Sequence, residues 1–528
     1  MEDFVQSTAV LSCGQSKAIR PDGGRSTSGA STYFTVDSAA GRLVAAIGWS
    51  GGWKCSFDCR QDGLHIAGGL EDCRFFLYPG EKLVLPSMVA LFCEEDTEDA
   101  YSLFRRLVLR HYVPTLKGRD KSPYIFCNTC FTRGGGWLDE CNAENQISLI
   151  KALQPLDVEA VITDAGWYPG GWMCNVGNWY PDPARYPDGM APVAAAAAQE
   201  HMRYGLWFEL ERVASTSKMA KEHPEMLLRN TTLSNSAGAY EDYLVDLGKP
   251  EAVDHIYSIV ESMLSIPNFG CYRQDFNIDP RPIWRANDTP DRFGVTEIKY
   301  INGLYAFLDR IRENHPDVFL NGCAGGGRRM DIEMIKRFHT HQTTDFWFND
   351  TVDQNTQFFL AHYLPNVCFT AHINRYDDYT MNTDIGASLC LGWIADSTEE
   401  RFGENPPFSF TRARKLIDRY QEVRLYLNGD FYPLTEPDNS EAACLASEYI
   451  DREKQAGVLL VYKRSQCRLS AIRLCLKKLE PEASYTLTDL TEECSWSVSG
   501  AALMEGLDLA LPMQREAKVI AFCREGLV

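Results

Sequence analysis

Short apolar strands alternate with amphipathic helical stretches along the middle of this 528-residue chain, and this alternation restricts the fold more than any other feature. Helical stretches such as Glu144–Leu153, Pro250–Leu264 and Thr296–Arg312 separate the strands. The predicted strands are Tyr124–Asn128, Ala160–Asp164, Tyr204–Glu209, Gly270–Asp275, Val318–Cys323, Gln342–Asp345, Asn366–His372 and Ala387–Trp393. Such repeated alternation predicts an α/β fold, a parallel (β/α)8 TIM barrel, whose active site lies at the C-terminal ends of its strands.

The segments on either side of the predicted barrel are rich in strands instead. Leu43–Trp49 and Lys82–Phe92 precede the barrel, and Gly457–Lys463 follows it; all three have strand-like composition with turn residues nearby. We therefore expect three domains: an N-terminal β-sandwich-like domain over residues 1–118, the barrel over residues 119–427 and a C-terminal antiparallel β-sandwich over residues 428–528.

Charge and composition exclude several kinds of partner. The formal net charge is −20 and the sequence pI is near 5.0, so the surface repels nucleic acid phosphates and anionic lipids. No apolar run reaches the roughly 18 residues that span a bilayer. The N-terminus shows no secretory signal, and the 18 cysteines are expected to be reduced thiols, which favours the cytoplasm. We therefore expect no nucleic acid and no membrane as partner.

Two carboxylates in barrel-like settings point to sugar chemistry. The run Cys271–Asp275 ends in a carboxylate at a predicted strand end, and the glycine-rich stretch Asn321–Asp331 follows it. Asp345 lies beyond, in a polar and aromatic setting. Barrel hydrolases present two acids to a sugar in this way, because one attacks the sugar while the other protonates the leaving oxygen. The pattern therefore predicts a glycosidase.

Five motifs, in one order, resemble those of glycoside hydrolase family 36, the α-galactosidase family in the clan that also holds families 27 and 31. The matching stretches are Ile162–Trp167 (family MDDGW), Gly205–Val213 with His223–Glu225 (GLWFEPEMV…HP), Asp246–Glu251 (LDLxxPE), Tyr272–Asn277 (IKWDMN) and Cys323–Asp331 (CSGGGGRFD). The resemblance covers the barrel well and the terminal domains weakly. It implies a retaining exo-α-glycosidase that hydrolyses terminal α-galactosides by double displacement, and it implies a homo-oligomer.

By this resemblance Asp275 is the nucleophile, which attacks the anomeric carbon and forms a glycosyl-enzyme intermediate. Counting forward from Asp331 puts the general acid/base at Asp345, whereas counting back from the following helix favours Asp350, with Asp353 as the remaining alternative. This acid needs a raised pKa, because it first donates a proton and later takes one back. In a retaining enzyme the two carboxyl groups lie roughly 5–6 Å apart.

The resemblance also implies a set of sugar-binding residues. Asp164 would bind sugar hydroxyls or else cap a helix, and Trp207 would line the pocket wall or else be packed core. Arg273 stands where the family has Lys and still offers donors, although its planar fork differs from an ammonium. Arg328 would contact a hydroxyl or pair with Asp331. The remaining candidates are Trp167, Asn277 beside the sugar 2-OH, Cys323 and Gly325 in the loop that approaches the sugar, and His341 in or directly behind the pocket.

One departure from the family concerns the sugar. Asp164-Ala165 stands where the family has two aspartates, so one acceptor for the 4-OH or 6-OH is lost. Buried polar contacts discriminate strongly between sugars. Galactose is the default, and N-acetylgalactosamine, galactosamine or a relative is the alternative with the same mechanism. A carbohydrate-binding barrel that does not catalyse is the alternative from another class.

Other short motifs do not support a metal or cofactor. Cys127–Cys130 has CxxC spacing, but no second cysteine pair accompanies it. Gly325–Gly327 is not followed by the GK[ST] of a phosphate-binding loop. His339 and His341 lie near Asp345 without an identifiable third ligand. We therefore expect no metal and no cofactor, and a small carbohydrate, an α-glycoside, as the substrate.

Overall fold

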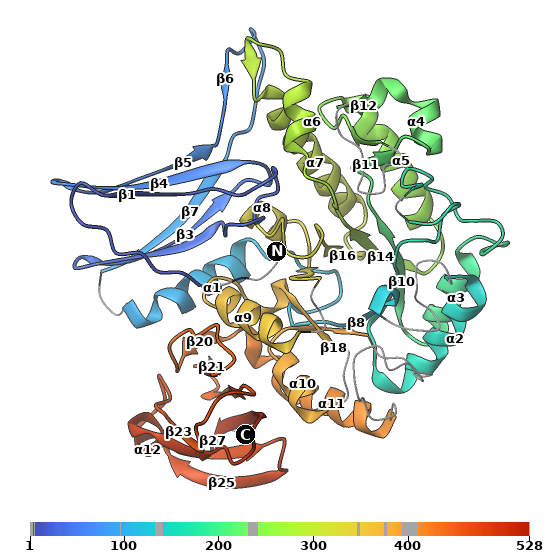
Figure 1. Cartoon of the computed structure of the whole chain (residues 1–528). Helices are drawn as coiled ribbons and strands as arrows, with labels where there is room; N and C mark the ends of the chain where they lie inside the picture. The colour runs from blue at the N-terminus through green and yellow to red at the C-terminus, as the bar shows by residue number, and fades with distance from the viewer. Residues whose placement is uncertain are drawn as a thin grey trace.

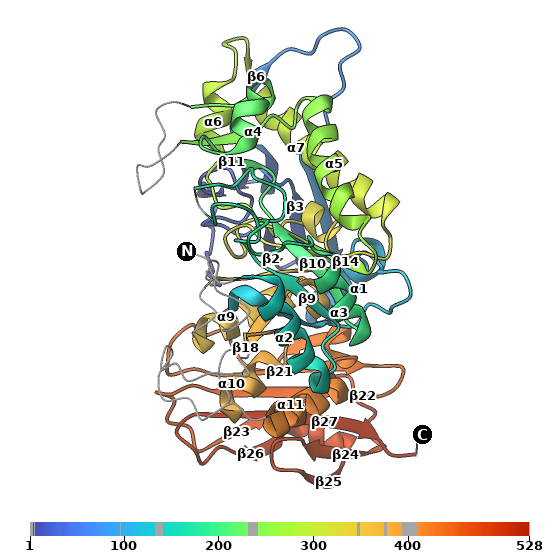
Figure 2. The same cartoon turned by 90° about the vertical axis from the view of Figure 1, so that its right-hand side faces the viewer.

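The computed structural model describes residues 4, 6–94, 97–131, 141–172, 174–230, 241–345, 349–373, 377–392 and 410–526 of the chain. A β-rich N-terminal part, a (β/α)8 barrel and a C-terminal β-sheet follow one another in sequence. In Figure 1 the N-terminal strands (blue) lie to the left of the barrel and the C-terminal strands (red) lie below it. Figure 2 shows the C-terminal strands from the side, as a layer at the bottom of the molecule.

Eight parallel strands form the barrel, and they pair in the order β17-β16-β14-β10-β9-β8-β19-β18. A parallel bridge between His341 and Phe369 joins the two ends of this sheet and closes the barrel. The register sets Arg273 on β14 beside Trp207 on β10 and Asn321 on β16. The strands are β8 (Ile125–Asn128), β9 (Ala160–Thr163), β10 (Arg203–Phe208), β14 (Phe269–Gln274), β16 (Phe319–Gly322), β17 (Thr340–His341), β18 (Thr370–Ile373) and β19 (Ser388–Leu391).

Helices follow the strands and cover the outside of the barrel (Figure 1). In α5, Pro250 occupies the first helical position, where the missing N–H has no partner to lose. The same helix buries Ile256, Val260 and Leu264, which share one face. The helices are α2 (Ala143–Leu153), α3 (Ala191–Gln199), α4 (Lys218–Glu222), α5 (Pro250–Leu264), α6 (Arg281–Ala286), α7 (Val295–Asn314), α8 (Ile332–Ile335), α9 (Asp350–Ala361), α10 (Asp378–Asp384) and α11 (Phe410–Val423). A small antiparallel sheet of β11 (Arg212–Ala214), β13 (Asp242–Val245) and β12 (Leu227–Leu228) is inserted after β10.

The predicted fold class is confirmed, although two barrel strands lie elsewhere than expected. The prediction of a strand at Gln342–Asp345 is wrong, because pairing with β16 ends at His341. The seventh strand begins only at Thr370, since residues 366–368 form a 3-10 helix whose Asn366 side chain donates to the Gly386 carbonyl. Trp393, the last residue of the predicted eighth strand, lies outside the described residues.

The N-terminal part stacks two small antiparallel sheets. The predicted strand Lys82–Phe92 is too long, because β7 begins at Ser87, after Pro86, which has no N–H for a ladder. The backbone of Val84 instead exchanges hydrogen bonds with the Asn302 side chain of α7 (2.9 and 3.0 Å). The elements are β1 (Ser16–Ile19), β4 (Trp53–Arg60) and β5 (Gly63–Leu70) in one sheet, β2 (Tyr33–Ser38), β3 (Gly41–Gly48) and β7 (Ser87–Cys93) in the other, β6 (Arg74–Phe75) paired with β15 (Arg292–Phe293), and the helix α1 (Ala100–His111).

The C-terminal part is a six-stranded antiparallel sheet covered by a two-stranded sheet and a short helix. Tyr432, Leu459, Leu487, Leu509 and Phe522 contribute to a separate apolar core there. The large sheet contains β20 (Asp430–Pro433), β21 (Cys444–Asp451), β22 (Ala456–Lys463), β27 (Glu516–Arg524), β24 (Ser484–Asp489) and β25 (Cys494–Ser499), and the cover contains β23 (Ala471–Leu474), β26 (Leu507–Ala510) and α12 (Gly500–Glu505).

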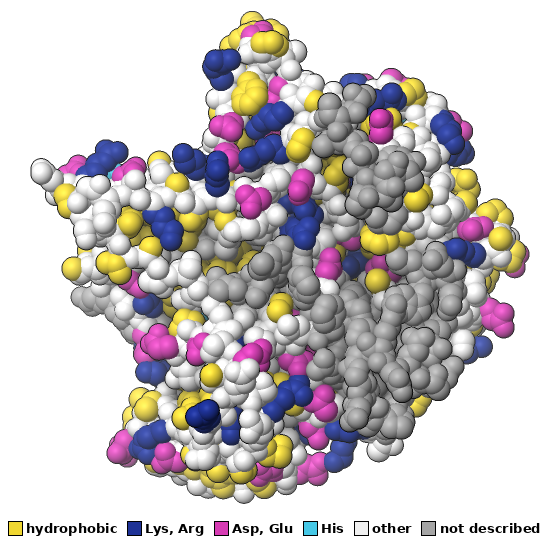
Figure 3. Space-filling model, viewed as in Figure 1, with side chains coloured by type: hydrophobic (Ala, Val, Ile, Leu, Met, Phe, Trp, Pro, Cys, Tyr) yellow, Lys and Arg dark blue, Asp and Glu magenta, His cyan; other side chains and the backbone are white. Residues whose placement is uncertain are grey.

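Charged side chains of both signs are interspersed over the described part of the face in Figure 3. None of the described helices combines the length and apolar character that crossing a membrane requires. All 18 cysteines are free thiols.

A buried carboxyl group lies within the C-terminal sheet. Glu448 on β21 is 0% exposed, and its Oε2 accepts the Lys477 backbone N–H (2.7 Å). Its Oε1 has no hydrogen-bond partner among the described residues. Burial raises the pKa of Glu448 to about 8, because a low-dielectric interior disfavours the charged form. The folded protein therefore binds this proton more tightly than the unfolded chain does.

We expect Glu448→Gln to make the protein more stable than the wild type at alkaline pH. The wild type keeps the full contribution of neutral Glu448 below about pH 4.3, the pKa in an unfolded chain, and loses it as the pH rises through about 8. Glutamine stays neutral, so the difference in the free energy of unfolding grows with pH to a few kcal/mol. Urea unfolding between pH 5 and 9 measures it, with Glu453→Gln at an exposed position as the control. Equal pH dependence of all three proteins would contradict the expectation.

Candidate active site

The C-terminal ends of the barrel strands bring four predicted site residues together. Asp164 follows β9, Trp207 and Arg273 lie near the ends of β10 and β14, and Asp275 follows β14. All four side chains are buried, with Asp275 8% and Arg273 3% exposed. This rim is where barrel proteins place reactive groups.

Asp275 is held by N–H donors on both of its oxygens. Its Oδ1 accepts the backbone N–H groups of Phe276 (2.7 Å) and Gly325 (2.9 Å), and its Oδ2 accepts Trp207 Nε1–H (3.1 Å). Burial alone would raise the pKa of Asp275, but the charge of Arg273 and these hydrogen bonds outweigh it and keep the pKa below the ordinary value. Asp275 is therefore an ionised carboxylate at neutral pH.

Arg273 is the buried cation of the site. Its two Nη groups donate to the side-chain oxygens of Asn321 and Gln342, and its Nε lies 3.4 Å from Asp164 Oδ2. Each edge of the guanidinium therefore faces a protein acceptor. A planar fork suits this arrangement, since a lysine ammonium is a single point charge.

Asp164 lies between Arg273 and the end of the first strand. Its Oδ2 accepts Asn128 Nδ2–H (2.7 Å) and its Oδ1 accepts the N–H of Ala165 (2.9 Å). Burial raises the pKa of Asp164 from the ordinary value, while the charge of Arg273 opposes that rise. The segment after it is a turn, so Asp164 does not begin a helix. Ala165, 2% exposed, adds only a methyl group to this corner.

Asp345 has the opposite electrostatic setting from Asp275. Among the described residues, its Oδ1 accepts one hydrogen bond, from Gln342 Nε2 (2.7 Å). The carboxyl group remains accessible to solvent at the mouth, yet the protein around it displaces much of its hydration. This desolvation and the charge of Asp275 raise the pKa of Asp345 to about 6, against the opposing charges of Arg273 and Arg328.

The glycine-rich loop after β16 approaches Asp275 closely. Gly325 has φ +59°, and an added Cβ there would lie 3.1 Å from Asn277 Oδ1 and 3.6 Å from Arg328 Nη1. Asn277 Nδ2 is buried without a hydrogen-bond partner among the described residues, although this amide helps to lower the pKa of Asp275. Cys323, 7% exposed, also favours the charged form of Asp275. Asn277 thus retains donor capacity beside the carboxylate.

Aromatic rings back the site on one side. The Trp207 ring is 1% exposed and stacks on Tyr168 with 6.4 Å between ring centroids. Trp167 is 0% exposed, and its Nε1–H donates to the Trp207 carbonyl (2.8 Å). Trp167 therefore binds the backbone of Trp207 directly, and its predicted contact with a sugar stays a prediction.

Three other predicted residues make contacts with groups other than Asp275 and Asp345. His341 is 2% exposed, packs on Phe338 and has Nδ1 3.3 Å from the Cys368 carbonyl oxygen. Asp350 begins α9 and forms an ion pair with Arg515 of the C-terminal sheet. Asp353 is buried in the first turn of the same helix. None of these arrangements provides the accessible, isolated acid that Asp345 provides.

Asn321, Gln342 and Glu209 are site residues that sequence analysis did not single out. Asn321 and Gln342 hold Arg273, and Gln342 links it to Asp345. Glu209 is 0% exposed, accepts the Asn277 backbone N–H (2.5 Å) and pairs with Arg212 (2.7 Å). A usable signal existed only for Glu209, which lies at a predicted strand end within a recognised motif.

The chemistry available to this arrangement is that of two acids whose pKa values are displaced in opposite directions. A carboxylate kept ionised and a carboxyl group with a raised pKa at the same mouth suit nucleophilic attack combined with proton donation. Among the described residues, no group of three or more His, Cys, Asp or Glu side chains is arranged to hold a metal ion.

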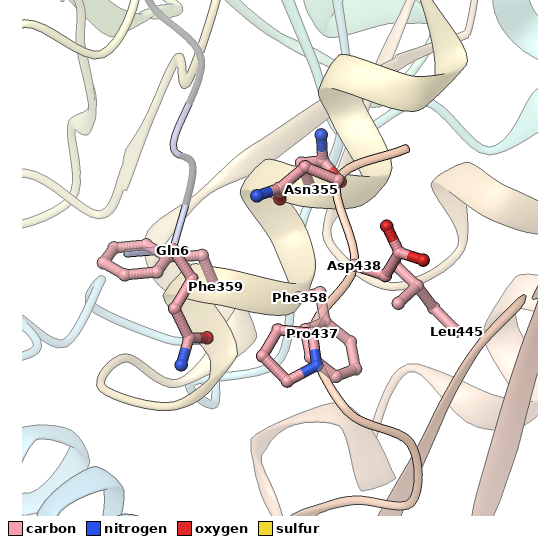
Figure 4. Close-up of a pocket in the computed structure, with 8 residues that line it drawn as sticks. Gln6, Asn355, Phe358, Phe359, Pro437, Asp438 and Leu445 are labelled. Carbon is pink, nitrogen blue, oxygen red and sulfur yellow. The ribbon is translucent and has the colours of Figure 1, made fainter. Parts of the chain in front are cut away.

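A different hollow, shown in Figure 4, shares no residue with this cluster. Gln6, Phe358 and Phe359 line it together with Pro437 and Asp438 of the C-terminal part. It holds one carboxylate, and a single acid cannot perform a two-carboxylate reaction. The barrel mouth therefore remains the candidate active site.

Residues 86–389, more than half of the chain, match the Melibiase family. The chain is similar to α-galactosidase 1 of Pediococcus pentosaceus, with 22% identity over 473 residues, covering 86% of this chain and 62% of that protein. It is also similar to α-galactosidase C of Emericella nidulans, with 25% identity over 481 residues, covering 85% of this chain and 59% of that protein. The chain thus spans less than two thirds of the length of either relative.

Solved structures share the fold. The GH36 α-galactosidase AgaA of Geobacillus stearothermophilus, in complex with raffinose, superposes with a TM-score of 0.83 at 19% identity, covering 97% of this chain and 72% of that chain. The galactosidase domain of the α-galactosidase–sucrose kinase AgaSK superposes with a TM-score of 0.78 at 19% identity, covering 97% and 71%.

Proposed function

Because this chain belongs to the Melibiase family, we propose that it is a retaining exo-α-galactosidase, which hydrolyses terminal α-galactosides by double displacement. One observation carries the proposal: two carboxyl groups at one barrel mouth have pKa values displaced in opposite directions. Asp275 is held ionised, whereas the pKa of Asp345 is raised to about 6. A nucleophile and a general acid require this division.

In the first step Asp275 attacks the anomeric carbon while Asp345 donates its proton to the departing glycosidic oxygen. The N–H groups of Gly325 and Trp207 aim the attacking carboxylate, since both bind its oxygens. In the second step Asp345, now ionised, takes a proton from water, and that water releases the sugar from Asp275. The sugar keeps its α configuration because two inversions occur.

Asp164, Arg273 and Asn277 are the proposed sugar-binding groups. Asp164 offers carboxylate oxygens to hydroxyls, and Asn277 offers the buried amide donors described above. Arg273 contributes mainly as the cation that holds Asp164 in place. AgaA was crystallised with raffinose and with stachyose, which supports short oligosaccharides with a terminal α-galactose as substrates of this chain.

A second sugar is a specific alternative, and Ala165 is the observation that favours it. This buried methyl group stands beside Asp164, where a second aspartate would add an acceptor. An α-linked N-acetylgalactosamine, galactosamine or relative would use the same two acids. Discrimination would then follow from the acceptor missing at position 165.

We also propose that the protein is a cytoplasmic homo-oligomer. The 18 free thiols suit a reducing compartment. Half of the large hydrophobic side chains exposed in the described part of the chain lie between residues 64 and 92. Some of them form the tip near β6 at the top of Figures 1 and 3, and others lie on the edge strand β7, which carries no charged residue. Such a surface is typical of an interface between subunits.

Hydrolysis of a panel of aryl α-glycosides tests the proposal. The sugars in the panel are galactose, N-acetylgalactosamine, galactosamine and glucose. We expect release from the α-galactoside, reduced in Asp275→Gly by at least about a thousandfold, since the attacking group is gone. Azide added to Asp275→Gly should yield the β-galactosyl azide, because it attacks the same face without a second inversion. Azide added to Asp345→Ala should yield the α-azide. No turnover of any sugar would favour the non-catalytic barrel.

We expect kcat/KM to decline as the pH rises above about 6, because only protonated Asp345 can donate. On the acidic side it should decline below the ordinary aspartate value of 3.8, as Asp275 takes up a proton. Rates on p-nitrophenyl α-galactoside between pH 3 and 9 measure both limbs. In Asp345→Ala the alkaline limb should vanish for a leaving group that needs no proton, such as dinitrophenolate. Its persistence there would assign the limb to another group.

We expect Ala165→Asp to raise the kcat/KM ratio of the α-galactoside over the α-N-acetylgalactosaminide, by about tenfold or more, because it restores a buried acceptor. Ala165→Asn is the matched control, since it has similar volume and no charge. Equal ratios in wild type and Ala165→Asp would remove position 165 from the determinants of specificity.

Sedimentation equilibrium tests the oligomer. We expect a mass that is a multiple of the 59.6 kDa chain, and a smaller multiple in Phe92→Lys, which charges the exposed edge of β7. Phe410→Lys, also at an exposed phenylalanine, is the control. A monomeric wild type would refute the proposed association.

A further inference from the structure

A three-residue segment of the N-terminal part, Arg25–Thr27, is buried against the barrel. It lies between β1 and β2, and its side chains are 3%, 0% and 7% exposed in chain order. Trp53 Nε1–H on β4 donates to the Ser26 carbonyl (2.8 Å) and ties the segment to its own domain. These three side chains reach across to two barrel loops.

Ser26 and Thr27 bind the far side of the glycine-rich loop. Thr27 N–H donates to the Arg328 carbonyl (2.8 Å), and its hydroxyl donates to the Gly327 carbonyl (2.5 Å). The Ser26 hydroxyl donates to Asp331 Oδ2 (2.6 Å), where Asp331 caps α8. The N-terminal part therefore fixes the loop from its outer side.

Arg25 connects this loop with the one that carries Asp275. Its Nη1 donates to the Phe276 carbonyl (3.1 Å) and to the Ala324 carbonyl (3.2 Å). Phe276 directly follows Asp275, and Ala324 directly precedes Gly325. Phe276 itself and Gly325, the residue after Ala324, also supply the two backbone N–H groups that bind Asp275 Oδ1. One nitrogen atom thus spans the two peptide segments that hold the carboxylate.

The second Nη group of Arg25 is held as well. Arg25 Nη2 donates to Asp279 Oδ1 (2.7 Å), at the rim. An added Cβ on Gly325 would lie 3.3 Å from Arg25 Nη1, so the guanidinium lies against the loop without spare room. A single ammonium cannot reproduce this fork toward three oxygens.

We propose that Arg25 is a positioning residue for the reaction: it clamps the loops after β14 and β16 together and so aims Asp275 at the anomeric carbon. This inference rests on the proposed function, in which Asp275 is the nucleophile. Arg25 itself touches backbone carbonyls and Asp279, not the reacting atoms. The N-terminal part consequently completes the active site of the barrel within one chain.

Loss of the clamp has a defined chemical consequence. The carbonyls of Phe276 and Ala324 lose their shared donor, and the Gly325 N–H is then free to drift from Asp275. A carboxylate with fewer donors is harder to keep ionised, so the acidic limb of the pH profile moves up. Misplacement acts on the reacting geometry, so kcat falls by about 10- to 100-fold while KM changes little.

The test compares Arg25→Met and Arg25→Lys with the wild type. The control is Arg20→Met, which removes an exposed arginine that pairs with Glu71 in the same part of the chain. For both Arg25 variants we expect the lower kcat, an acidic limb shifted upward and faster amide hydrogen exchange in peptides covering residues 275–279 and 323–328. For Arg20→Met we expect none of these changes. Arg25→Lys should restore little of the lost kcat, because a lysine ammonium keeps the charge but lacks the planar fork that binds both loops.

Failure of this proposal and failure of the proposed function are separable. A wild type that hydrolyses nothing in the panel contradicts the function, and hydrogen exchange, which needs no substrate, then decides on the clamp alone. Unchanged exchange in both loops overturns the clamp. Faster exchange with an unmoved acidic limb and unchanged kcat overturns the positioning role. If Arg25→Met does not fold, Arg25→Lys carries the same comparisons.

Discussion

The buried positive charge of Arg273 is the interaction on which the rest of the site depends. Burial alone would raise the pKa of each carboxyl group around it, and its charge opposes that rise at Asp164, Asp275 and Asp345. A guanidinium stays charged at every relevant pH, so this opposition is permanent. The carboxamides of Asn321 and Gln342 hold the guanidinium without adding charge. Arg273 and the three carboxyl groups can therefore share one barrel mouth. A buried charge without a partner of opposite sign would destabilise the fold there.

The difference between the two acids then arises from hydrogen-bond donors rather than from position alone. Within the described part of the chain, Asp275 receives N–H groups from Phe276, Gly325 and Trp207, whereas Asp345 receives one from Gln342. Once Asp275 is ionised, its charge contributes to the raised pKa of Asp345. The ionisation of the first acid thus prepares the second, and the proposed nucleophile and proton donor are coupled from the start.

Local sequence patterns predicted those parts of the molecule that are determined by residues close together in the sequence. The strand–helix alternation predicted the barrel, and the strand-end carboxylate Asp275 could be found from its motif. The strand β17 was misplaced because its two-residue pairing is set by β16, not by its own composition. Gln342 was missed for a related reason: its value lies in contacts with Arg273, a residue 69 positions away. For Trp167, the motif position likewise does not reveal the hydrogen bond from its ring N–H to the Trp207 carbonyl.

Arg25 shows that contacts between the N-terminal part and the barrel are equally hard to predict from local sequence patterns. Its contacts reach 251 and 299 positions along the chain, to carbonyl groups that any sequence would present. Backbone carbonyls leave no trace in residue identity, so no motif on the barrel side could have indicated the contact. The loop after β16 carries Gly325–Gly327, and the loop after β14 has no regular secondary structure between Asp275 and Pro280, so neither has a helix or strand ladder of its own to fix it. The N-terminal part binds these loops through Arg25, Ser26 and Thr27. The proposed catalytic unit is therefore the barrel together with this segment, and a barrel excised at residue 119 would lack the donors that bind the loops around Asp275.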